Sequence, residues 1–222
     1  MEAPMTENGL SRFGYDAWVR HTGAESVPDG FSSARVIEVN KNSFVVSDGA
    51  HEMFAELSGK FLFDAETPTD FPTVGDWVRI QALDKNTLAV IHAVLPRHTL
   101  LKRKEPGKKI DFQLIAANID SGFIVQSAEK LNFNLLDRYV VMLHESGIEP
   151  VAVFSKIDLL SPSEIKALKD RLAALKHKYL LISNVAAHGL DELAGTLARG
   201  NTYCLLGQSG VGKTSLLNKL LH

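Results

Sequence analysis

The chain has 222 residues, which is enough for one large domain or two small ones. Hydrophobic residues make up 45% and charged residues 23%, as in ordinary soluble globular proteins, and the net charge of −2 excludes a uniformly basic nucleic-acid binder. No apolar run is long enough to span a membrane, no signal-peptide pattern opens the chain, and the single cysteine, Cys204, fits a reducing compartment. We therefore expect a cytoplasmic protein without a membrane partner.

Residues 1–30 are predicted to be an N-terminal leader. Phe13, Tyr15, Trp18 and Val19 lie between positions 11 and 21, and they can form a short amphipathic helix against the next domain. A flexible, partly ordered leader is the alternative. The sequence favours neither.

Residues 31–96 have a β pattern, with Asp48-Gly49 as a strong hairpin signal. The strand-like segments are 35–39, 43–46, 51–57, 76–80 and 87–91. Five strands over this length predict a small closed barrel, for which the OB-fold is the commonest form and an SH3-like barrel is the competitor. Such barrels often bind RNA but also serve as scaffolds, so the pattern alone leaves an RNA-binding role open.

Residues 97–111 are interpreted as a basic linker. Its positive side chains are Arg97, Lys102, Arg103, Lys104, Lys108 and Lys109. A solvated linker is the usual explanation for such a run. However, this one joins a candidate RNA-binding barrel to the next domain, so contact with RNA phosphates is an equal alternative. These six residues are the candidate RNA-binding residues.

Residues 112–222 alternate between apolar strand-like runs and helical patterns, which predicts a parallel sheet covered by helices. Strands are expected at 119–125, 151–154, 179–182 and 202–206, and helices at 133–146, 161–177, 190–198 and from Lys213 onward. Ser161-Pro162-Ser163-Glu164 is a capping box with proline at the first helical position, so the second of these helices begins there.

The strongest motif in this domain is a phosphate-binding loop. Gly207-Gln208-Ser209-Gly210-Val211-Gly212-Lys213-Thr214 fits G-x-x-x-x-G-K-[ST], with an apolar strand before it and a helix that continues through Ser215. The glycines let backbone N–H groups converge on a phosphate at the positive end of that helix. By the mechanics of the motif, Lys213 reaches the β- and γ-phosphates and Thr214 ligates Mg²⁺. These two are the candidate catalytic residues, and Thr214 is the candidate metal ligand.

A second motif, Ser155-Lys156-Ile157-Asp158, follows the strand at 151–154 and resembles the Asn/Thr-Lys-x-Asp base-recognition element of GTPases. A carboxylate such as Asp158 accepts from both N1–H and the 2-amino group of guanine, whereas adenine would leave it unpaired. Lys156 would lay its aliphatic stem along the base. Ser155 stands where asparagine is usual, which predicts weaker nucleotide affinity with an unchanged base preference.

Ser183-Asn184 follows the next strand and occupies the place of the Ser-Ala element, whose backbone N–H meets guanine O6. Asn184 replaces the usual alanine there. The candidate residues for binding GTP or GDP are Ser155, Lys156, Asp158, Ser183, Asn184, Gly207, Gln208, Ser209, Gly210, Val211, Gly212, Lys213, Thr214 and Ser215.

The base element, then the Ser-Ala-like loop, then the phosphate loop is a circular permutation of the usual GTPase order. A barrel ahead of such a domain resembles the RsgA (YjeQ or EngC) family of ribosome small-subunit-dependent GTPases, over about residues 35–221. The resemblance is carried by Gly75-Asp76-Trp77-Val78, Leu95-Pro96-Arg97, Arg103-Lys104-Glu105-Pro106-Gly107, Ala117-Asn118-Ile119-Asp120, Leu136-Asp137-Arg138-Tyr139, Gly147-Ile148-Glu149-Pro150 and the stretch from Gly207 to Ser215.

The resemblance implies an N-terminal all-β OB-fold barrel (31–96) and a circularly permuted α/β P-loop GTPase domain (112–222) that is incomplete at its C-terminus. It further implies GTP hydrolysis stimulated by the 30S subunit, contact of the OB-fold with ribosomal RNA, and a role in late 30S maturation; we expect a monomer. Family members continue into switch I, the Asp-x-x-Gly element of switch II and a zinc-binding domain. We therefore expect a truncated chain that hydrolyses GTP poorly, zinc only in the absent domain, and an exposed edge strand at 202–206.

Two other functions stay open. A P-loop ATPase or kinase with an unrelated barrel predicts protection by ATP, and Asp158 argues against it. An RNA-binding module with a vestigial or non-hydrolysing nucleotide site is favoured by Ser155, Asn184 and the expected truncation.

Overall fold

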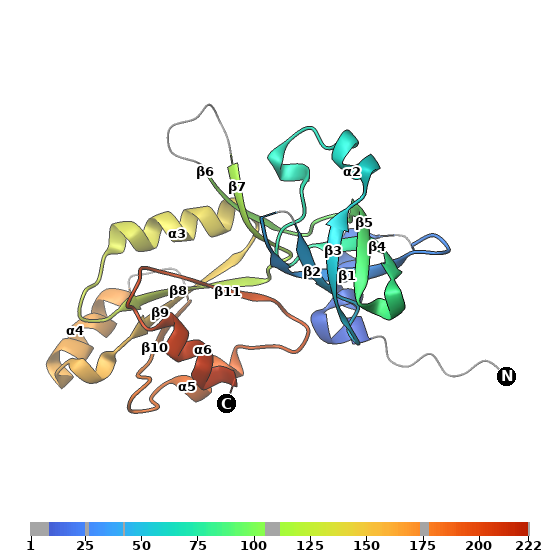
Figure 1. Ribbon diagram of the computed structural model, residues 1–222. Helices are drawn as coiled ribbons and strands as arrows, with labels where there is room; N and C mark the ends of the chain where they lie inside the picture. The colour runs from blue at the N-terminus through green and yellow to red at the C-terminus, as the bar shows by residue number, and fades with distance from the viewer. Residues whose placement is uncertain (1–8, 25–26, 42, 105–111, 174–177, 222) are drawn as a thin grey trace. The chain divides into compact units, whose positions relative to one another are not determined.

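The computed structural model describes residues 9–24, 27–41, 43–104, 112–173 and 178–221 (Figure 1). The chain divides into two compact units. Unit 1 consists of Met1–Ile119 together with Arg199–Thr202, and unit 2 consists of Asp120–Ala198 together with Tyr203–His222.

Unit 1 is built on a closed five-stranded barrel. Its strands are β1 (Ser32–Val39), β2 (Phe44–Ser47), β3 (Glu52–Leu57), β4 (Trp77–Leu83) and β5 (Leu88–Val94). They close in the order β1-β2-β3-β5-β4, and β3 and β5 form the parallel pair of the barrel while the other pairs are antiparallel. This order is that of the OB-fold, which confirms the predicted barrel and decides against the SH3-like form.

Alternation along the strands fills the barrel. Val36, Val46, Met53, Ile80 and Ile91 all point inward and are fully buried in one cluster. The expected hairpin between β2 and β3 is present. Its turn is stabilised by the Asp48 carboxylate, which accepts the backbone N–H groups of Ala50 and His51 at 2.8 and 2.7 Å. Two short helical segments, α2 (Gly59–Asp64) and the 3-10 turn η2 (Pro68–Asp70), connect β3 to β4.

The described part of the N-terminal segment is helical. The 3-10 turn η1 (Gly9–Phe13) leads into α1 (Tyr15–Thr22), so the amphipathic-helix alternative is confirmed for these residues. Trp18 is buried against Trp77 of β4, with ring centroids 5.7 Å apart, and its Nε1 donates to the carbonyl of Pro96 at 2.8 Å. These contacts make α1 part of the core of unit 1.

The segment between the barrel and unit 2 contains a β-hairpin. Strand β6 (Leu100–Lys104) pairs antiparallel with β7 (Phe112–Ala117), whereas the sequence suggested a linker at 97–111 and a domain boundary at 112. The backbone N–H of Ala117 donates to the carbonyl of Val74 at 2.8 Å, which ties β7 to the barrel segment. These contacts extend the compact unit to residue 119. The sequence did not indicate this boundary because the contacts are non-local and do not affect the local composition.

Unit 2 is a four-stranded parallel sheet covered by helices. In chain order its elements are β8 (Ser121–Ser127), α3 (Phe133–Glu145), β9 (Glu149–Ser155), the 3-10 turn η4 (Ile157–Leu159), α4 (Pro162–Leu172), β10 (Lys178–Leu181), α5 (Leu190–Gly195), β11 (Tyr203–Leu206) and α6 (Lys213–Leu221). The strand order is β10-β9-β8-β11, so β11 is an edge strand, as expected.

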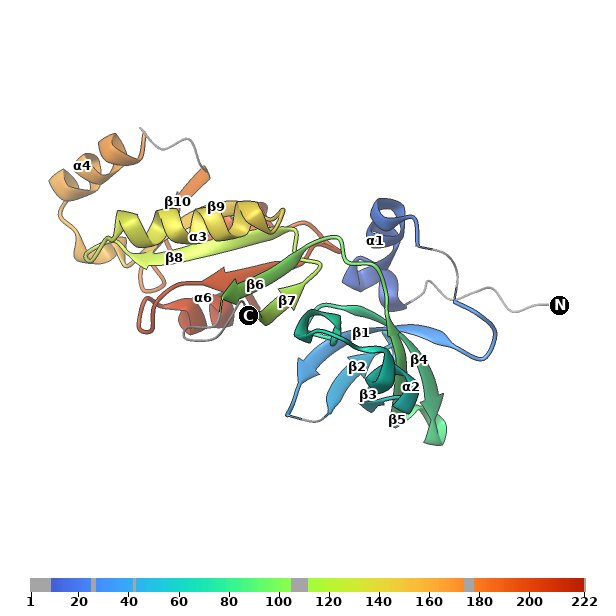
Figure 2. The same ribbon diagram turned by 90° about the horizontal axis from the view of Figure 1, so that it is seen from above.

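The two faces of this sheet are covered by different helices. Figure 2 shows α3 running along β8 on one face and α6 on the other. Leu193 of α5 and Leu216 of α6 pack with Val125 and Val153 in one buried cluster. The capping box at Ser161 is confirmed, but α4 ends at Leu172, and the rest of the helix expected up to 177 lies largely outside the described residues.

Candidate nucleotide-binding site

The phosphate loop lies between β11 and α6, in the strand–loop–helix context that the motif requires. Gly207, Gly210 and Gly212 have φ angles of 146°, 80° and 94°, which L side chains rarely adopt. At Gly207 a Cβ would lie 2.3 Å from the carbonyl oxygen of Val125 on the neighbouring strand β8. The loop therefore requires glycine here for its contact with the sheet as well as for its backbone angle.

The lysine of the loop is hydrogen-bonded to the loop itself, and the loop's hydroxyl groups are exposed. Lys213 Nζ donates to the carbonyl oxygens of Gly207 and Gln208, both at 2.7 Å, so its ammonium group is folded over the loop. Thr214 and Ser215 are exposed in the first turn of α6, and Gln208 and Ser209 are exposed at the tip of the loop. Val211 turns inward and anchors the loop in the core of unit 2.

Ser155, the last residue of β9, connects the base element to the phosphate loop. Its side chain is buried, and its hydroxyl lies 2.6 Å from the carbonyl oxygen of Val211 and 3.2 Å from that of Gln126. A hydroxyl carries one proton, so the shorter contact to Val211 is the stronger hydrogen bond. Ser155 therefore links β9 to the phosphate loop through a buried side-chain hydrogen bond.

The residues after Ser155 turn toward the loop that follows β10. Lys156 has a left-handed backbone (φ 61°), and Asp158 lies exposed in η4. Ser183 donates from its hydroxyl to Asp158 Oδ1 and accepts the N–H of Ala186 at 3.0 Å. The structure thus joins the two predicted base-recognition segments through a side-chain hydrogen bond.

Asn184 connects the same loop to the phosphate loop. Its Nδ2 lies 3.4 Å from the carbonyl oxygen of Gly212, while its Oδ1 is buried and has no hydrogen-bond partner among the described residues. Sequence reasoning used only the backbone of Asn184 and missed this side-chain contact. The sequence did contain one indication of this contact, because the Asn184 amide is a hydrogen-bonding group at a position where alanine is usual.

Other reactive side chains of the described segments do not add to this site. Burial raises the pKa of the Cys204 thiol in β11 to about 11, so the thiol stays protonated near neutral pH. In the described part of the chain, no group of three or more His, Cys, Asp or Glu side chains is arranged to hold a metal ion. Thr214 remains the one side chain that we assigned to Mg²⁺.

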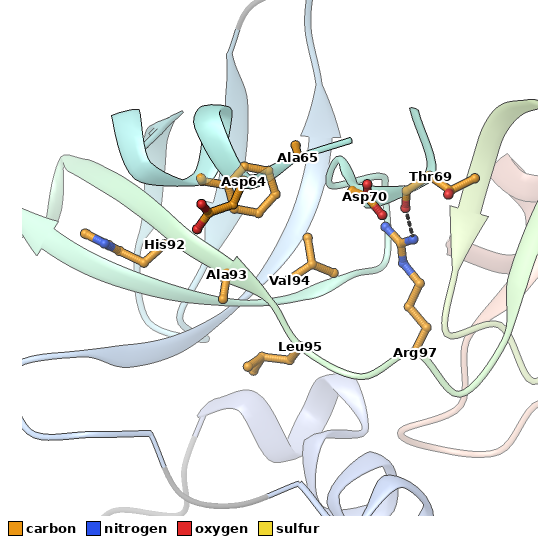
Figure 3. Close-up of a pocket in the computed structure, with 10 residues that line it drawn as sticks. Asp64, Ala65, Thr69, Asp70, His92, Ala93, Val94, Leu95 and Arg97 are labelled. Atoms are coloured by element: carbon orange, nitrogen blue, oxygen red, sulfur yellow. Dashed lines mark hydrogen bonds between the residues drawn. The ribbon is translucent and has the colours of Figure 1, made fainter. Parts of the chain in front are cut away.

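Arg97 has a structural role that the sequence did not predict. Its guanidinium donates to both oxygens of the buried Asp76 carboxylate and to the backbone carbonyls of Thr69 and Phe71. Figure 3 shows Arg97 turned toward Thr69 and Asp70. These residues and Asp64 line a hollow of about 430 Å³. Because its donors are engaged inside unit 1, we leave Arg97 out of the RNA-contacting set.

The other basic candidates lie on the β6–β7 hairpin or outside the described residues. Lys102 and Arg103 are exposed on β6; Lys102 Nζ lies 4.5 Å from the centroid of the Phe112 ring, and Arg103 Nε donates to Gln113 at 2.8 Å. Lys104 ends β6, and Lys108 and Lys109 lie outside the described residues. Lys102 and Arg103 therefore remain exposed cations on β6, directly after a register shift between Leu101 and Lys102.

An OB-fold barrel together with a parallel α/β unit, whose phosphate loop follows the two predicted base-recognition loops in the chain, defines a circularly permuted P-loop GTPase fold. The family model described as RsgA GTPase matches residues 94–222, more than half of the chain. The chain belongs to the RsgA GTPase family.

Relatives and solved structures agree with this family. The chain is 34% identical over 191 residues to "Small ribosomal subunit biogenesis GTPase RsgA 1" of Oceanobacillus iheyensis, covering 85% of this chain and 54% of that protein. It is 35% identical over 211 residues to the RsgA of Syntrophotalea carbinolica, covering 90% and 55%. The chain thus spans about half the length of these curated relatives.

Two solved structures share the fold. YjeQ from Thermotoga maritima has a TM-score of 0.68 at 24% identity, with 86% of this chain and 65% of that chain covered. YloQ, described as a circularly permuted GTPase, has a TM-score of 0.63 at 23% identity, with 88% and 66% covered.

Among the described residues, no helix combines the length and apolarity needed to cross a bilayer.

Proposed function

We propose that the chain binds guanine nucleotides, and that a protein of the full family length hydrolyses GTP with stimulation by ribosomal RNA and acts in late maturation of the 30S ribosomal subunit. The names of the relatives, small ribosomal subunit biogenesis GTPases, support the biological role. The observation that carries the biochemical part is the hydrogen-bonded convergence of three loops in unit 2. Ser155 and Asn184 contact the phosphate loop, and Ser183 contacts Asp158.

Base selection follows from Asp158. It is exposed at the carboxyl end of β9, where a nucleotide base in an open α/β sheet binds. Its carboxylate is acceptor-only when ionised, so it pairs with N1–H and the 2-amino group of guanine. Ser183 holds one oxygen of this carboxylate, which fixes its orientation before the base arrives.

Phosphate binding follows from the loop at Gly207–Thr214. Lys213 already lies over the loop, and it would exchange its two carbonyl contacts for phosphate oxygens. The exposed hydroxyl of Thr214 is a hard oxygen donor, which suits Mg²⁺ and leaves room for the waters that this ion retains. When bound, Mg²⁺ neutralises charge that develops on the phosphates.

The remaining parts of the proposal concern partners. The exposed cations Lys102 and Arg103 on β6 contact the phosphates of ribosomal RNA. The affinity that these contacts contribute falls as the salt concentration rises. The protein acts as a monomer in the cytoplasm. Zinc binding belongs to the part of the family pattern that follows the phosphate loop.

The test of nucleotide specificity is a comparison of GDP, GTP, ATP and XDP binding to the chain and to its Asp158→Asn variant. Guanine nucleotides are expected to bind the parent and ATP is not. The variant should lose guanine affinity and gain XDP affinity, because xanthine offers an acceptor where guanine has its amino group. Asp170→Asn, an exposed change on α4, is the matched control. Binding of ATP as tight as GTP would refute the assignment.

A further inference from the structure

The outer surface of the barrel carries a continuous apolar row. The strand register places Val45 of β2 opposite Phe54 of β3, and Phe54 opposite Leu88 of β5. Leu88 in turn lies opposite Leu83 of β4. The exposed fractions of Phe54, Leu88 and Leu83 are 66%, 47% and 44%. These four residues, which we call the outer stripe, cross four neighbouring strands on their solvent face.

The side chains of the outer stripe do not belong to the hydrophobic core of the barrel. Phe54 lies between the inward residues Met53 and Ala55, which are fully buried, so alternation alone directs it outward. The outward positions of a small closed barrel are ordinarily polar, and a contiguous exposed apolar set on such a surface marks an interaction site. In an OB-fold the face of strands 2 and 3 commonly binds oligonucleotides or oligosaccharides, and Phe54 lies on this face, so the charges around it must decide the kind of partner.

The charges around the outer stripe are mainly negative. The same face and its loops carry the exposed residues Glu38, Glu52, Glu56, Asp84, Lys41 and Lys85. Glu52 and Glu56 flank Phe54 on the same side of β3, two residues away in each direction. No ion pair among the described residues involves either of them. Four carboxylates against two ammonium groups give the stripe an acidic rim.

This combination decides between two kinds of partner. Single-stranded RNA stacks its bases on exposed aromatic rings, but such platforms lie in positively charged grooves that neutralise the backbone. Here carboxylates adjoin the one aromatic ring, so they would repel each phosphate that approached it. A Lys/Arg-rich protein segment meets both features, since its methylene stems cover apolar surface while its charged ends reach the carboxylates.

We propose that the outer stripe and its acidic rim dock a basic protein segment and not RNA. The backbone of β3 is paired on both sides, with β2 and with β5, so the partner cannot add a strand there. Recognition therefore uses side chains, with Phe54 as the apolar anchor and Glu52 and Glu56 as its ionic neighbours. The proposal is independent of the nucleotide site.

The test measures fluorescence anisotropy of three labelled probes with the full chain. One probe is a short peptide that alternates Lys or Arg with Leu or Val, the second replaces its cations with Glu, and the third is a single-stranded oligoribonucleotide. Phe54→Ser is expected to weaken basic-peptide binding about tenfold or more, as for an anchor residue. Glu56→Gln is expected to weaken it severalfold and to reduce its salt dependence.

Matched controls lie on α3 in unit 2. Val141→Ser removes a half-exposed apolar side chain and Glu145→Gln removes an exposed carboxylate, and neither is expected to change peptide binding. Oligoribonucleotide binding should be unchanged in Phe54→Ser. The proposal is overturned if the basic peptide does not bind, if the acidic peptide binds equally well, or if Phe54→Ser weakens the oligoribonucleotide instead. A melting temperature equal to that of the parent shows that Phe54→Ser is folded.

Discussion

Replacement of Arg97 by alanine tests whether this residue holds unit 1 together or contacts RNA. Arg97 Nε and Nη2 lie 2.8 and 2.7 Å from the two carboxylate oxygens of Asp76, and Nη2 also lies 2.8 Å from the carbonyl of Phe71. The Asp76 side chain has an exposed fraction of 0%, and that of Arg97 is 15%. The Arg97→Ala change would therefore leave a buried carboxylate without its cation.

The magnitude follows from burial. Removing one partner of a buried ion pair costs about 3–5 kcal/mol, because the other charge stays behind without compensation. A loss of 1 kcal/mol lowers the melting temperature by about 4–8 °C in a domain of about 100 residues and by about half as much in larger ones. Arg97→Ala is therefore expected to lower the melting temperature of unit 1 by roughly 10–25 °C.

The loss also depends on pH. Burial raises the pKa of the Asp76 carboxyl above its ordinary value, against the opposing effect of the Arg97 guanidinium. A carboxyl whose pKa is raised on folding favours the folded state most when it is protonated, and this contribution is lost as pH rises through the folded-state pKa. Without Arg97 the pKa rises further. The stability deficit of Arg97→Ala should therefore be smallest near pH 4 and grow toward pH 7.

The assay is thermal unfolding followed by circular dichroism across this pH range, together with oligoribonucleotide binding at a temperature where the variant is folded. Arg103→Ala, an exposed change on β6, is the control and should shift the melting temperature little. The reasoning fails if Arg97→Ala unfolds like the parent while losing RNA affinity. In that case Arg97 would be an RNA ligand whose buried contacts contribute nothing to stability.

Three further changes test other contacts. Gly207→Ala should lower the melting temperature of unit 2 several times more than Gly210→Ala, because a Cβ at Gly207 would lie 2.3 Å from the carbonyl oxygen of Val125. A Cβ at Gly210 meets nothing within 4 Å and adds only left-handed backbone strain of about 1–2 kcal/mol. Equal shifts would contradict the close contact with β8. Thr99→Val leaves a buried N–H and C=O of residue 119 without the hydroxyl that lies 2.7 and 2.8 Å from them, so urea unfolding should report a loss of about 1–3 kcal/mol. Trp18→Ala should cost about 3–5 kcal/mol by the same method, and a negligible loss would show that α1 is not part of the core.

The elements that the sequence predicted well are those specified by neighbouring residues. The turn at Asp48 is encoded by a side chain that bonds to the backbone two and three residues later. The start of α4 is encoded by Ser161 and Glu164, which cap each other within one turn. The phosphate loop is likewise contiguous, so its glycines, its lysine and its flanking strand and helix could all be identified before any coordinates were known.

The features that the sequence did not predict depend on partners far away along the chain. The basic composition of the segment that begins at Arg97 suggested a linker, because nothing nearby indicates that Asp76 will neutralise Arg97 or that β7 will pair with β6. The choice between helix and flexible leader for the N-terminal segment depended on Trp77, which buries Trp18 from a distance of 59 positions in sequence. Local patterns cannot encode such contacts, although each side chain is compatible with them.

The two departures in the base-recognition segments are best explained together. In the sequence, Ser155 and Asn184 are separate departures, one from the usual asparagine and the other from the usual alanine. In the structure both side chains point to the phosphate loop, Ser155 to the carbonyl of Val211 and Asn184 to that of Gly212. A backbone carbonyl requires only a donor, and the Ser155 hydroxyl and the Asn184 amide each supply one to a different carbonyl of the loop. The support of the phosphate loop is thus divided between β9 and the loop after β10, which couples both base-recognition segments to the loop that would hold the phosphates.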